Sequence, residues 1–140
     1  MPRYGHISAQ LSRRAIVYSG WTQDYSVENR KRLQSVIELC DPNTEQWETK
    51  KCAGEAPVPG LRSAASASSS DALFTYGGLG GDDKFVSSLH QLSANTYRWS
   101  ELSRQNTGGV SPMAKSGAGM IVCGDKLALL GGWGTPRGPT

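Results

Sequence analysis

The sequence lacks any apolar run long enough to cross a membrane. Its longest uncharged apolar runs, residues 15–18 and 127–130, fall far short of the roughly 20 residues that a membrane-spanning helix needs. The first six residues, Met-Pro-Arg-Tyr-Gly-His, contain no apolar segment of the kind found in a signal peptide. We therefore expect a protein of the cytoplasm, the nucleus or both, with no membrane partner.

An excess of charge of either sign is also missing. The chain has 15 Lys and Arg against 12 Asp and Glu, which gives a formal net charge of +3. So small and scattered an excess does not indicate a nucleic-acid-binding surface. The densest basic run, residues 30–32, lies in a polar stretch and is expected to be a solvated loop rather than a phosphate site. We expect no nucleic-acid partner.

Residues with metal-binding or catalytic chemistry are few. The two histidines, His6 and His90, stand far apart, and the three cysteines, Cys40, Cys52 and Cys123, show no C-x-x-C spacing. An odd number of cysteines without that spacing argues against both a disulfide framework and a zinc site. There is no Gly-x-Ser-x-Gly motif, and the glycine-rich residues 77–83 do not fit a phosphate-binding loop. We expect no catalytic residue, no metal and no cofactor.

What the sequence does contain is glycine, short apolar stretches and an internal repeat. Seventeen Gly and 7 Pro among 140 residues favour many short strands joined by turns. A shift of 52 residues superimposes two copies of one pattern, Asp41-x-Asn43-Thr44-x-x-Trp47 and Ser93-x-Asn95-Thr96-x-x-Trp99. A second marker, an apolar run that ends in a glycine step, occurs at residues 16–20, 73–78 and 127–132. Markers that recur in one order predict a repeat architecture.

Each repeat can be divided into four short strands. The first strand is rich in small residues and is expected at residues 6–11, 63–68 and 117–123; the second is the apolar run before the glycine step. The third is expected at residues 36–40 and 89–92, and the fourth begins at Trp47 or Trp99. Four strands per repeat are typical of a propeller blade. Small residues suit a strand at the crowded central axis, and both tryptophans are expected to fill the wedge between blades.

With these motifs in order, the chain resembles the kelch repeat family of β-propellers. The resemblance implies an all-β fold in which residues 1–140 form part of a propeller, with two four-stranded antiparallel blades and the first strands of a third. The repeats are expected at 1–56, 57–109 and, truncated, 110–140. Within the family the chain looks most like the N-terminal blades of kelch domain-containing protein 2 and its relatives.

The resemblance also implies a non-catalytic module that binds a protein or peptide. Members of that subfamily are expected to serve as substrate receptors of cullin-RING ubiquitin ligases that read peptide C-termini. The box that joins such a receptor to its ligase is absent from these 140 residues, so a ligase partner would be reached through other parts of a longer chain. The alternative is a scaffold for cytoskeletal or vesicle-traffic partners, and the sequence does not separate the two.

Candidate binding residues lie in the loops at one end of the blades, which are expected at residues 21–33, 53–63, 79–87, 104–116 and 133–137. A basic residue precedes each first strand, 16 or 17 residues before the glycine step, and a ring of such residues would suit a carboxylate or an acidic peptide. The rival interpretation is that these residues only bridge adjacent blades. A tryptophan follows two of the three glycine steps and could contact a partner or pack on a neighbouring loop. The candidates are Arg3, Tyr4, Trp21, Arg62, Ser63, Lys115, Ser116 and Trp133.

The number of repeats is small for a propeller. Closed propellers have about 4 to 8 blades, and closure is what removes exposed sheet edges. We therefore expect the isolated chain to be marginally stable, and its missing blades to come from a longer chain or from another subunit.

Overall fold

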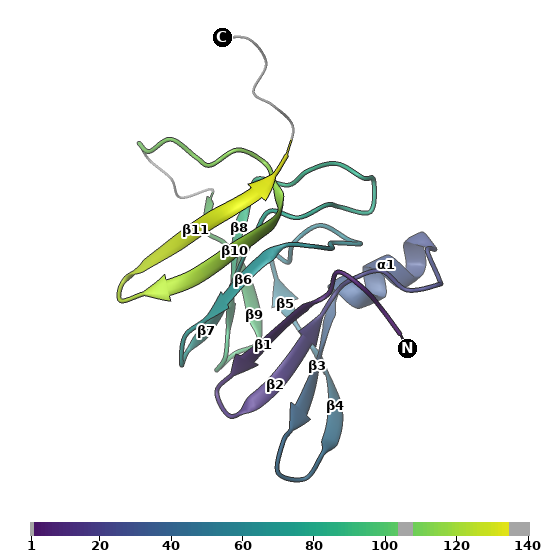
Figure 1. The fold of residues 1–140 in the computed structure, drawn as a ribbon. Helices are drawn as coiled ribbons and strands as arrows, with labels where there is room; N and C mark the ends of the chain where they lie inside the picture. The colour runs from purple at the N-terminus through teal and green to yellow at the C-terminus, as the bar shows by residue number, and fades with distance from the viewer. Residues whose placement is uncertain (1, 104–107, 135–140) are drawn as a thin grey trace.

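The computed structural model describes residues 2–103 and 108–134, and it is built almost entirely of antiparallel strands (Figure 1). Blade 1 is a four-stranded sheet in the order β1-β2-β3-β4. The third unit consists of one hairpin, β10 paired with β11, which we call the third hairpin. Blade 2 has the order β6-β7-β8-β9, with β5 added at its outer edge. The expected fold, two blades and the first strands of a third, is confirmed. The bounds are β1 Ile7–Leu11, β2 Arg14–Tyr18, β3 Val36–Asp41, β4 Gln46–Lys51, β5 Ala53–Gly54, β6 Ala65–Ser68, β7 Ala72–Tyr76, β8 Leu89–Ser93, β9 Arg98–Glu101, β10 Ser116–Cys123 and β11 Lys126–Trp133.

The three units follow one another with the same geometry. Gly5, Ser63 and Gly117 stand at equivalent places before the first strand of each unit, and all three have positive φ angles of 56° to 67°. The Ser63 N–H donates to the Gly5 carbonyl at 2.7 Å, and the Gly117 N–H donates to the Ser63 carbonyl at 3.0 Å. One repeated hydrogen bond therefore links each unit to the next. The third hairpin continues the arrangement of the two blades.

The strand β5 is a feature that the repeat pattern does not predict. Its two residues leave blade 1 and pair in parallel with β9 of blade 2. Gly54 has φ +87°, and a Cβ atom there would collide with the carbonyl oxygen of Trp99. Glycine is the residue that tolerates both the positive φ and the close approach. The repeat boundaries at 56 and 109 stay a prediction.

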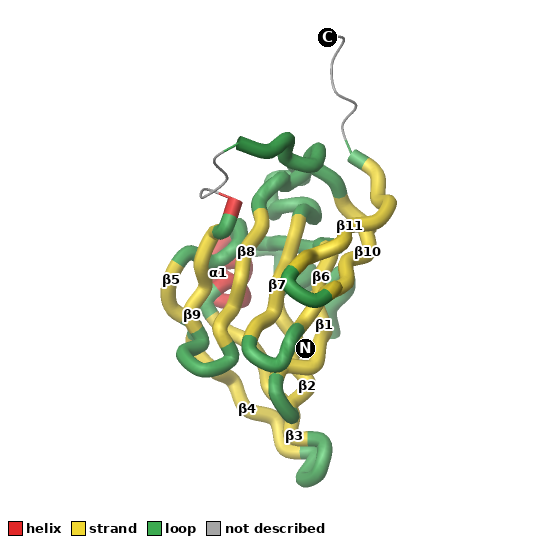
Figure 2. The backbone as a smooth tube through the Cα atoms, turned by 90° about the vertical axis from the view of Figure 1, so that its left-hand side faces the viewer, coloured by secondary structure: helices red, strands yellow, loops and turns green. Residues whose placement is uncertain are grey.

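The two ends of the sheets differ. Tight turns join β1 to β2, β3 to β4, β6 to β7 and β10 to β11 at one end (lower left in Figure 1), and the longer connections gather at the other. We call the second the loop end. It carries the single α-helix of the described residues, α1 Val27–Gln34, which lies behind β8 and β9 in Figure 2. The stretch of residues 21–33, expected to be a loop, therefore contains seven helical residues, 27–33.

The core lies between blades 1 and 2. From blade 1 it takes Ile16, Tyr18, Ile37 and Leu39, and from blade 2 it takes Leu73, Leu92 and Trp99, all 2% exposed or less. The rings of Tyr18 and Trp99 pack at 4.9 Å between centroids. Burial of each such side chain is worth about 1.5–3 kcal/mol. A smaller cluster of Ala65, Tyr76 and Met120 joins blade 2 to the third hairpin.

The prediction that both repeat tryptophans fill a wedge between blades is confirmed for Trp99 and wrong for Trp47. Trp99 is 1% exposed, whereas Trp47 is 61% exposed. The two residues occupy equivalent places, because Trp99 pairs with Leu92 and Trp47 pairs with Cys40 across neighbouring strands. Blade 1 packs on the face of blade 2 that carries Trp99. Among the described residues, no sheet packs on the face of blade 1 that carries Trp47.

Within the described ranges, no helix is both long and apolar enough to pass through a membrane.

Candidate functional site

The loop end is organised around Trp21, which follows the glycine step of blade 1. Its backbone N–H donates to the Tyr4 carbonyl and its carbonyl accepts from the Tyr4 N–H, both at 2.9 Å. Its indole Nε1–H donates to the Gly60 carbonyl of the connection to blade 2, also at 2.9 Å. These bonds fix the ring at the junction of the two blades.

Trp21 is the centre of a cluster of aromatic rings and one arginine. The Arg62 guanidinium carbon lies 3.9 Å from the Trp21 ring centroid, in cation–π geometry. The ring centroids of Tyr25 and Tyr4 lie 5.0 and 6.3 Å from that of Trp21. Tyr4 is 56% exposed and Tyr25 is 55% exposed. We call Tyr4, Trp21, Tyr25 and Arg62 the aromatic–arginine cluster.

Arg62 also holds a carboxylate. Its Nη2 donates to Asp83 Oδ1 at 2.5 Å, and its Nη1 donates to the Gly80 carbonyl at 3.3 Å. The side chain of Arg62 is 14% exposed, whereas that of Asp83 is 68% exposed. Arg62 therefore bridges the two blades, as the rival interpretation proposed, and at the same time presents a charge-assisted carboxylate site near the surface.

The predicted ring of equivalent basic residues is wrong at one of its three positions. Tyr4, Arg62 and Ser116 each pair with the residue that follows the glycine step of their own unit. Arg3 and Lys115 stand one residue earlier, where blade 2 has the buried, apolar Leu61. Comparison of the repeats aligned Arg62 with Arg3 because both are basic. The strand pairing instead makes Arg62 equivalent to Tyr4, one residue later than Arg3.

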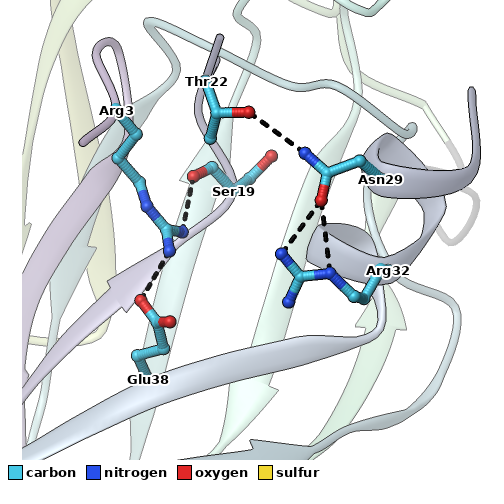
Figure 3. A network of polar contacts seen from close by, with 6 residues as sticks. All are labelled: Arg3, Ser19, Thr22, Asn29, Arg32 and Glu38. Carbon is cyan, nitrogen blue, oxygen red and sulfur yellow. Dashed lines mark hydrogen bonds and ion pairs between the residues drawn. The ribbon is translucent and has the colours of Figure 1, made fainter. Parts of the chain in front are cut away.

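Arg3 and Lys115 serve similar structural roles. Arg3 donates to the Ser19 carbonyl at 3.1 Å and to Glu38 Oε2 at 2.6 Å, and its side chain is 8% exposed (Figure 3). Lys115 Nζ donates to the Gly131 carbonyl, the place equivalent to Ser19, at 3.2 Å from an exposed position. Arg3 is thus held inside blade 1, while Lys115 remains accessible.

The other predicted residues lie apart from the cluster. Ser116 is 3% exposed, and Ser63 uses its backbone in the link between blades. Trp133 is 69% exposed and meets Phe85 edge to face at 5.2 Å between ring centroids. The structure therefore brings together Tyr4, Trp21 and Arg62 and places Trp133 in a second aromatic pair.

A second group of contacts attaches α1 to the loop end. The Asn29 side-chain amide donates to Thr22 Oγ1 at 3.0 Å, and its oxygen accepts from Arg32 at 2.9 and 3.2 Å (Figure 3). The amide also donates to the Asp24 carbonyl at 3.0 Å. Two hydrogen bonds from Ser26, which caps the helix, lower the pKa of Asp24. Arg30 donates to the Gly81 carbonyl of blade 2 at 2.6 Å. Much of the basic run 30–32 is therefore structural, which corrects the expectation of a solvated loop.

A shallow groove of about 360 Å³ runs beside the helix, lined by Val27, Arg30, Lys31, Val58, Pro59, Gly81, Asp82 and Val86.

The sequence did not single out Tyr25, Asp83 and Phe85 as residues that contact the candidate site residues. They lie in the loops that it selected, but no pattern indicated which loop side chains would meet. Residues 104–107 and 135–137, also selected as candidate surface, lie outside the described residues. Among the residues that the structure describes, no group of His, Cys, Asp and Glu side chains could hold a metal ion.

Comparison with known proteins places the chain in a family. Residues 1–137 match the family described as the KLHDC2/KLHL20/DRC7 Kelch-repeats domain. The chain belongs to the kelch-repeat family. The kelch domain is also similar in structure to the chain titled "Structure of YjhT", with a TM-score of 0.71, 19% identity and coverage of 93% of this chain and 44% of that one.

Kelch relatives match over nearly the whole domain. The chain is 30% identical to the Rab9 effector protein with kelch motifs of Bos taurus and 31% identical to that of Homo sapiens; each match covers 94% of this chain and 34% of the relative. It is 29% identical to the host cell factor homolog hcf-1 of Caenorhabditis elegans, over 94% of this chain and 18% of that protein. The chain thus spans about a third of the Rab9 effector relatives. These matches support a protein-interaction module.

Proposed function

We propose that this kelch module binds a protein or peptide partner through the aromatic–arginine cluster at its loop end. The observation that carries the proposal is the Trp21 ring, packed against the Arg62 guanidinium and flanked by two tyrosines that are more than half exposed. Aromatic and arginine side chains contribute most of the energy at protein interfaces. Here the Trp21 and Arg62 side chains already donate hydrogen bonds to the Gly60 and Gly80 carbonyls, so little of their side-chain entropy is lost on binding.

The chemistry of Arg62 favours a partner that presents a carboxylate. Asp83 already binds the guanidinium from an exposed position, and the free carboxylate of a peptide C-terminus could take its place with the same hydrogen bonds. This supports the proposal that the longer protein is the substrate receptor of a cullin-RING ubiquitin ligase. The ligase itself would be bound by parts of the protein outside these residues.

A peptide array tests the proposal. Peptides with free C-termini are compared with the same peptides carrying a C-terminal amide, using the 140-residue chain and two variants, Arg62→Ala and Trp21→Ala. We expect each variant to weaken binding of the selected peptides by about tenfold or more, because truncation of a hot-spot residue costs about 2 kcal/mol or more. Arg14→Ala is the control, because Arg14 is an exposed arginine paired with Glu48 at the opposite end of the sheets.

The outcomes separate two levels of the proposal. Equal binding of free and amidated peptides would rule out recognition of a C-terminal carboxylate, and with it the reading of peptide C-termini. The cluster could still bind internal sequences. Peptide binding that neither Arg62→Ala nor Trp21→Ala changes would remove the cluster as the binding site.

A vesicle-traffic scaffold is the second candidate, and the named relatives favour it. The bovine and human relatives are Rab9 effector proteins, and the matched part is this kelch region. Titration of purified Rab9 into the chain by calorimetry tests this function. Binding that depends on Trp21 would support it, and absence of binding would leave the peptide-receptor function as the better account.

A further inference from the structure

The groove beside α1 lies at the junction of blades 1 and 2, and we call it the α1 groove. Its walls are α1 itself, the connection between the blades at Val58 and Pro59, and the connection from β7 to β8 at residues 81–86. The Gly81 N–H donates to the Pro59 carbonyl at 3.0 Å, which joins two of these walls. Each wall has strands of blade 1 or blade 2 on both sides of it along the chain, so the two complete blades determine the shape of the groove.

A valine from each wall lines the α1 groove. Val27 of α1 is 57% exposed and Val58 is 40% exposed, while Val86 packs partly buried against the core between the blades. Exposed apolar side chains that gather in one hollow mark a binding surface, unlike those that are scattered singly. A single apolar side chain of a partner would remove water from all three valines.

The α1 groove also carries two cations, Arg30 and Lys31. Among the described residues neither forms an ion pair, because the three arginines that do are Arg3, Arg14 and Arg62. The Nε–H of Arg30 is buried and meets no acceptor within the described ranges. No carboxylate therefore balances the charge of this half-buried guanidinium, and an anion that enters the groove would offset it.

The backbone around Arg30 fixes its position. Its Nη1 donates to the Gly81 carbonyl at 2.6 Å, and a Cβ atom at Gly60 or Gly81 would collide with its side chain. Gly60 has a φ of +73°, whereas Gly81 has no positive φ, so the contact with Arg30 is what favours glycine at position 81. Asp82 is the one acidic residue of the described lining, and its Oδ1 accepts from the Lys84 N–H at 3.2 Å.

We propose that the α1 groove binds an acidic segment of a partner protein in which an apolar side chain stands next to a glutamate or an aspartate. The apolar side chain covers Val27, Val58 and Val86, and the carboxylate lies beside Arg30 and Lys31. Charge complementarity selects this occupant, because the lining holds two cations and one carboxylate. The site goes beyond the proposed function, since it needs no free C-terminus and does not include the aromatic–arginine cluster.

Four peptides of six residues, acetylated and amidated so that neither end is charged, test the proposal. Their central pairs are Glu-Leu, Gln-Leu, Glu-Ser and Gln-Ser. Each peptide is titrated into the isotope-labelled 140-residue chain, and NMR chemical shifts give both the affinity and the place of binding. We expect the Glu-Leu peptide to bind about threefold tighter than Gln-Leu, because an exposed charge pair contributes modestly. It should bind about tenfold tighter than Glu-Ser, because leucine buries apolar surface.

Two variants locate the site. Lys31→Glu reverses a charge in the α1 groove, and Val58→Asp places a carboxylate among its valines. Both positions are exposed, so far-UV circular dichroism should show each variant folded. We expect each to weaken binding of the Glu-Leu peptide by about threefold or more. Lys126→Glu, the same charge change at an exposed lysine in the turn between β10 and β11, is the matched control and should bind like the natural sequence.

Several outcomes overturn the proposal. Failure of the Glu-Leu peptide to bind does so, and so does equal binding of Glu-Leu and Gln-Leu or unchanged binding by Lys31→Glu. Shifts centred on Trp21 and Arg62 would assign the peptides to the aromatic–arginine cluster instead. Shifts of the groove valines that depend on protein concentration without peptide would assign the groove to a second copy of the chain. Since none of the peptides has a free C-terminus, failure here leaves the reading of peptide C-termini to its own test.

Discussion

At the scale of single residues, Ser19 shows how one side chain replaces a missing glycine. It stands where the other units have Gly77 and Gly131, and it shares their positive φ, at +55°. Its hydroxyl donates to the Leu61 carbonyl at 2.8 Å, and the residue is 2% exposed. The cost of the left-handed backbone is offset by a buried hydrogen bond between blades.

This role predicts the effect of removing the hydroxyl. Ser19→Ala should lower the free energy of unfolding by about 1 kcal/mol more than Ser12→Ala, because a buried hydrogen bond contributes about that much. Ser12 is the matched control, since it has φ +56° but is exposed, so both variants carry the same backbone strain. Urea unfolding curves measure both. Equal losses would mean that the Ser19 hydroxyl contributes nothing.

The two repeat tryptophans should respond very differently to truncation. Trp99→Ala should cost about 3–5 kcal/mol, because it opens a cavity between the blades. Trp47→Ala should change the monomer by less than about 0.5 kcal/mol, as expected for an exposed position. Thermal unfolding at concentrations where the chain is monomeric compares them. Similar losses would contradict the exposed placement of Trp47.

At the scale of elements, the strands were predictable and the helix was not. Each predicted strand begins or ends within two residues of the observed one, because apolar runs bounded by glycine steps and Asx turns define both ends. The helix α1 has low apolar content, and the preceding residue, Ser26, caps it by accepting a hydrogen bond from the Asn29 N–H. It is held by polar contacts of Asn29 and Arg30 with neighbouring loops, and hydrophobic periodicity carries no signal for such contacts.

The attachment of α1 depends on Asn29, which is 6% exposed. Asn29→Ala should destabilise the loop end by about 1–3 kcal/mol, since it leaves buried polar groups without partners. Hydrogen exchange should become faster in residues 22–34 and stay unchanged in β7 and β8. Glu28→Ala, an exposed change in the same helix, is the control and should leave exchange slow. Uniformly faster exchange over the whole chain would show that α1 is not a separate local unit.

At the scale of the whole molecule, the order of blades followed from the repeat, but the cluster at the loop end did not. Repeats predict that equivalent strands lie side by side, and this set Tyr4, Trp21 and Arg62 among the candidates at one end of the blades without indicating that they would meet. The partners Tyr25 and Asp83 come from loops whose paths depend on backbone turns, such as the positive φ of Asp83. The exposed Trp47 was missed because a repeat implies a neighbour for every unit, including the first.

The stability of the whole chain should fall at alkaline pH. Burial raises the pKa of the Cys52 thiol to about 11 from a usual value near 9, and burial also raises the pKa of Tyr18. Between these two cysteine values the folded chain holds a proton that the unfolded chain releases, so the stability present below about pH 9 declines as pH rises toward about 11. Urea midpoints at several pH values measure this decline.

Cys52→Ala supplies the comparison. Its midpoint should fall less steeply over the same pH range, and the fall that remains above pH 10 should reflect Tyr18 and Tyr76, whose pKa values are both raised by burial. Cys123→Ala, at an exposed cysteine, should behave like the natural sequence. Identical slopes for all three proteins would contradict a buried, protonated Cys52.

The parallel pairing of β5 with β9 also determines how such a chain can be divided. The two residues Ala53 and Gly54 precede blade 2 in the chain yet form its outermost strand. A segment that starts at the predicted repeat boundary, residue 57, would lack β5, the edge strand of its own sheet. The edge of β9 would then be exposed. A segment that starts before residue 53 would keep β5 with blade 2. The structural unit that can be moved to another protein therefore starts earlier in the chain than the sequence repeat.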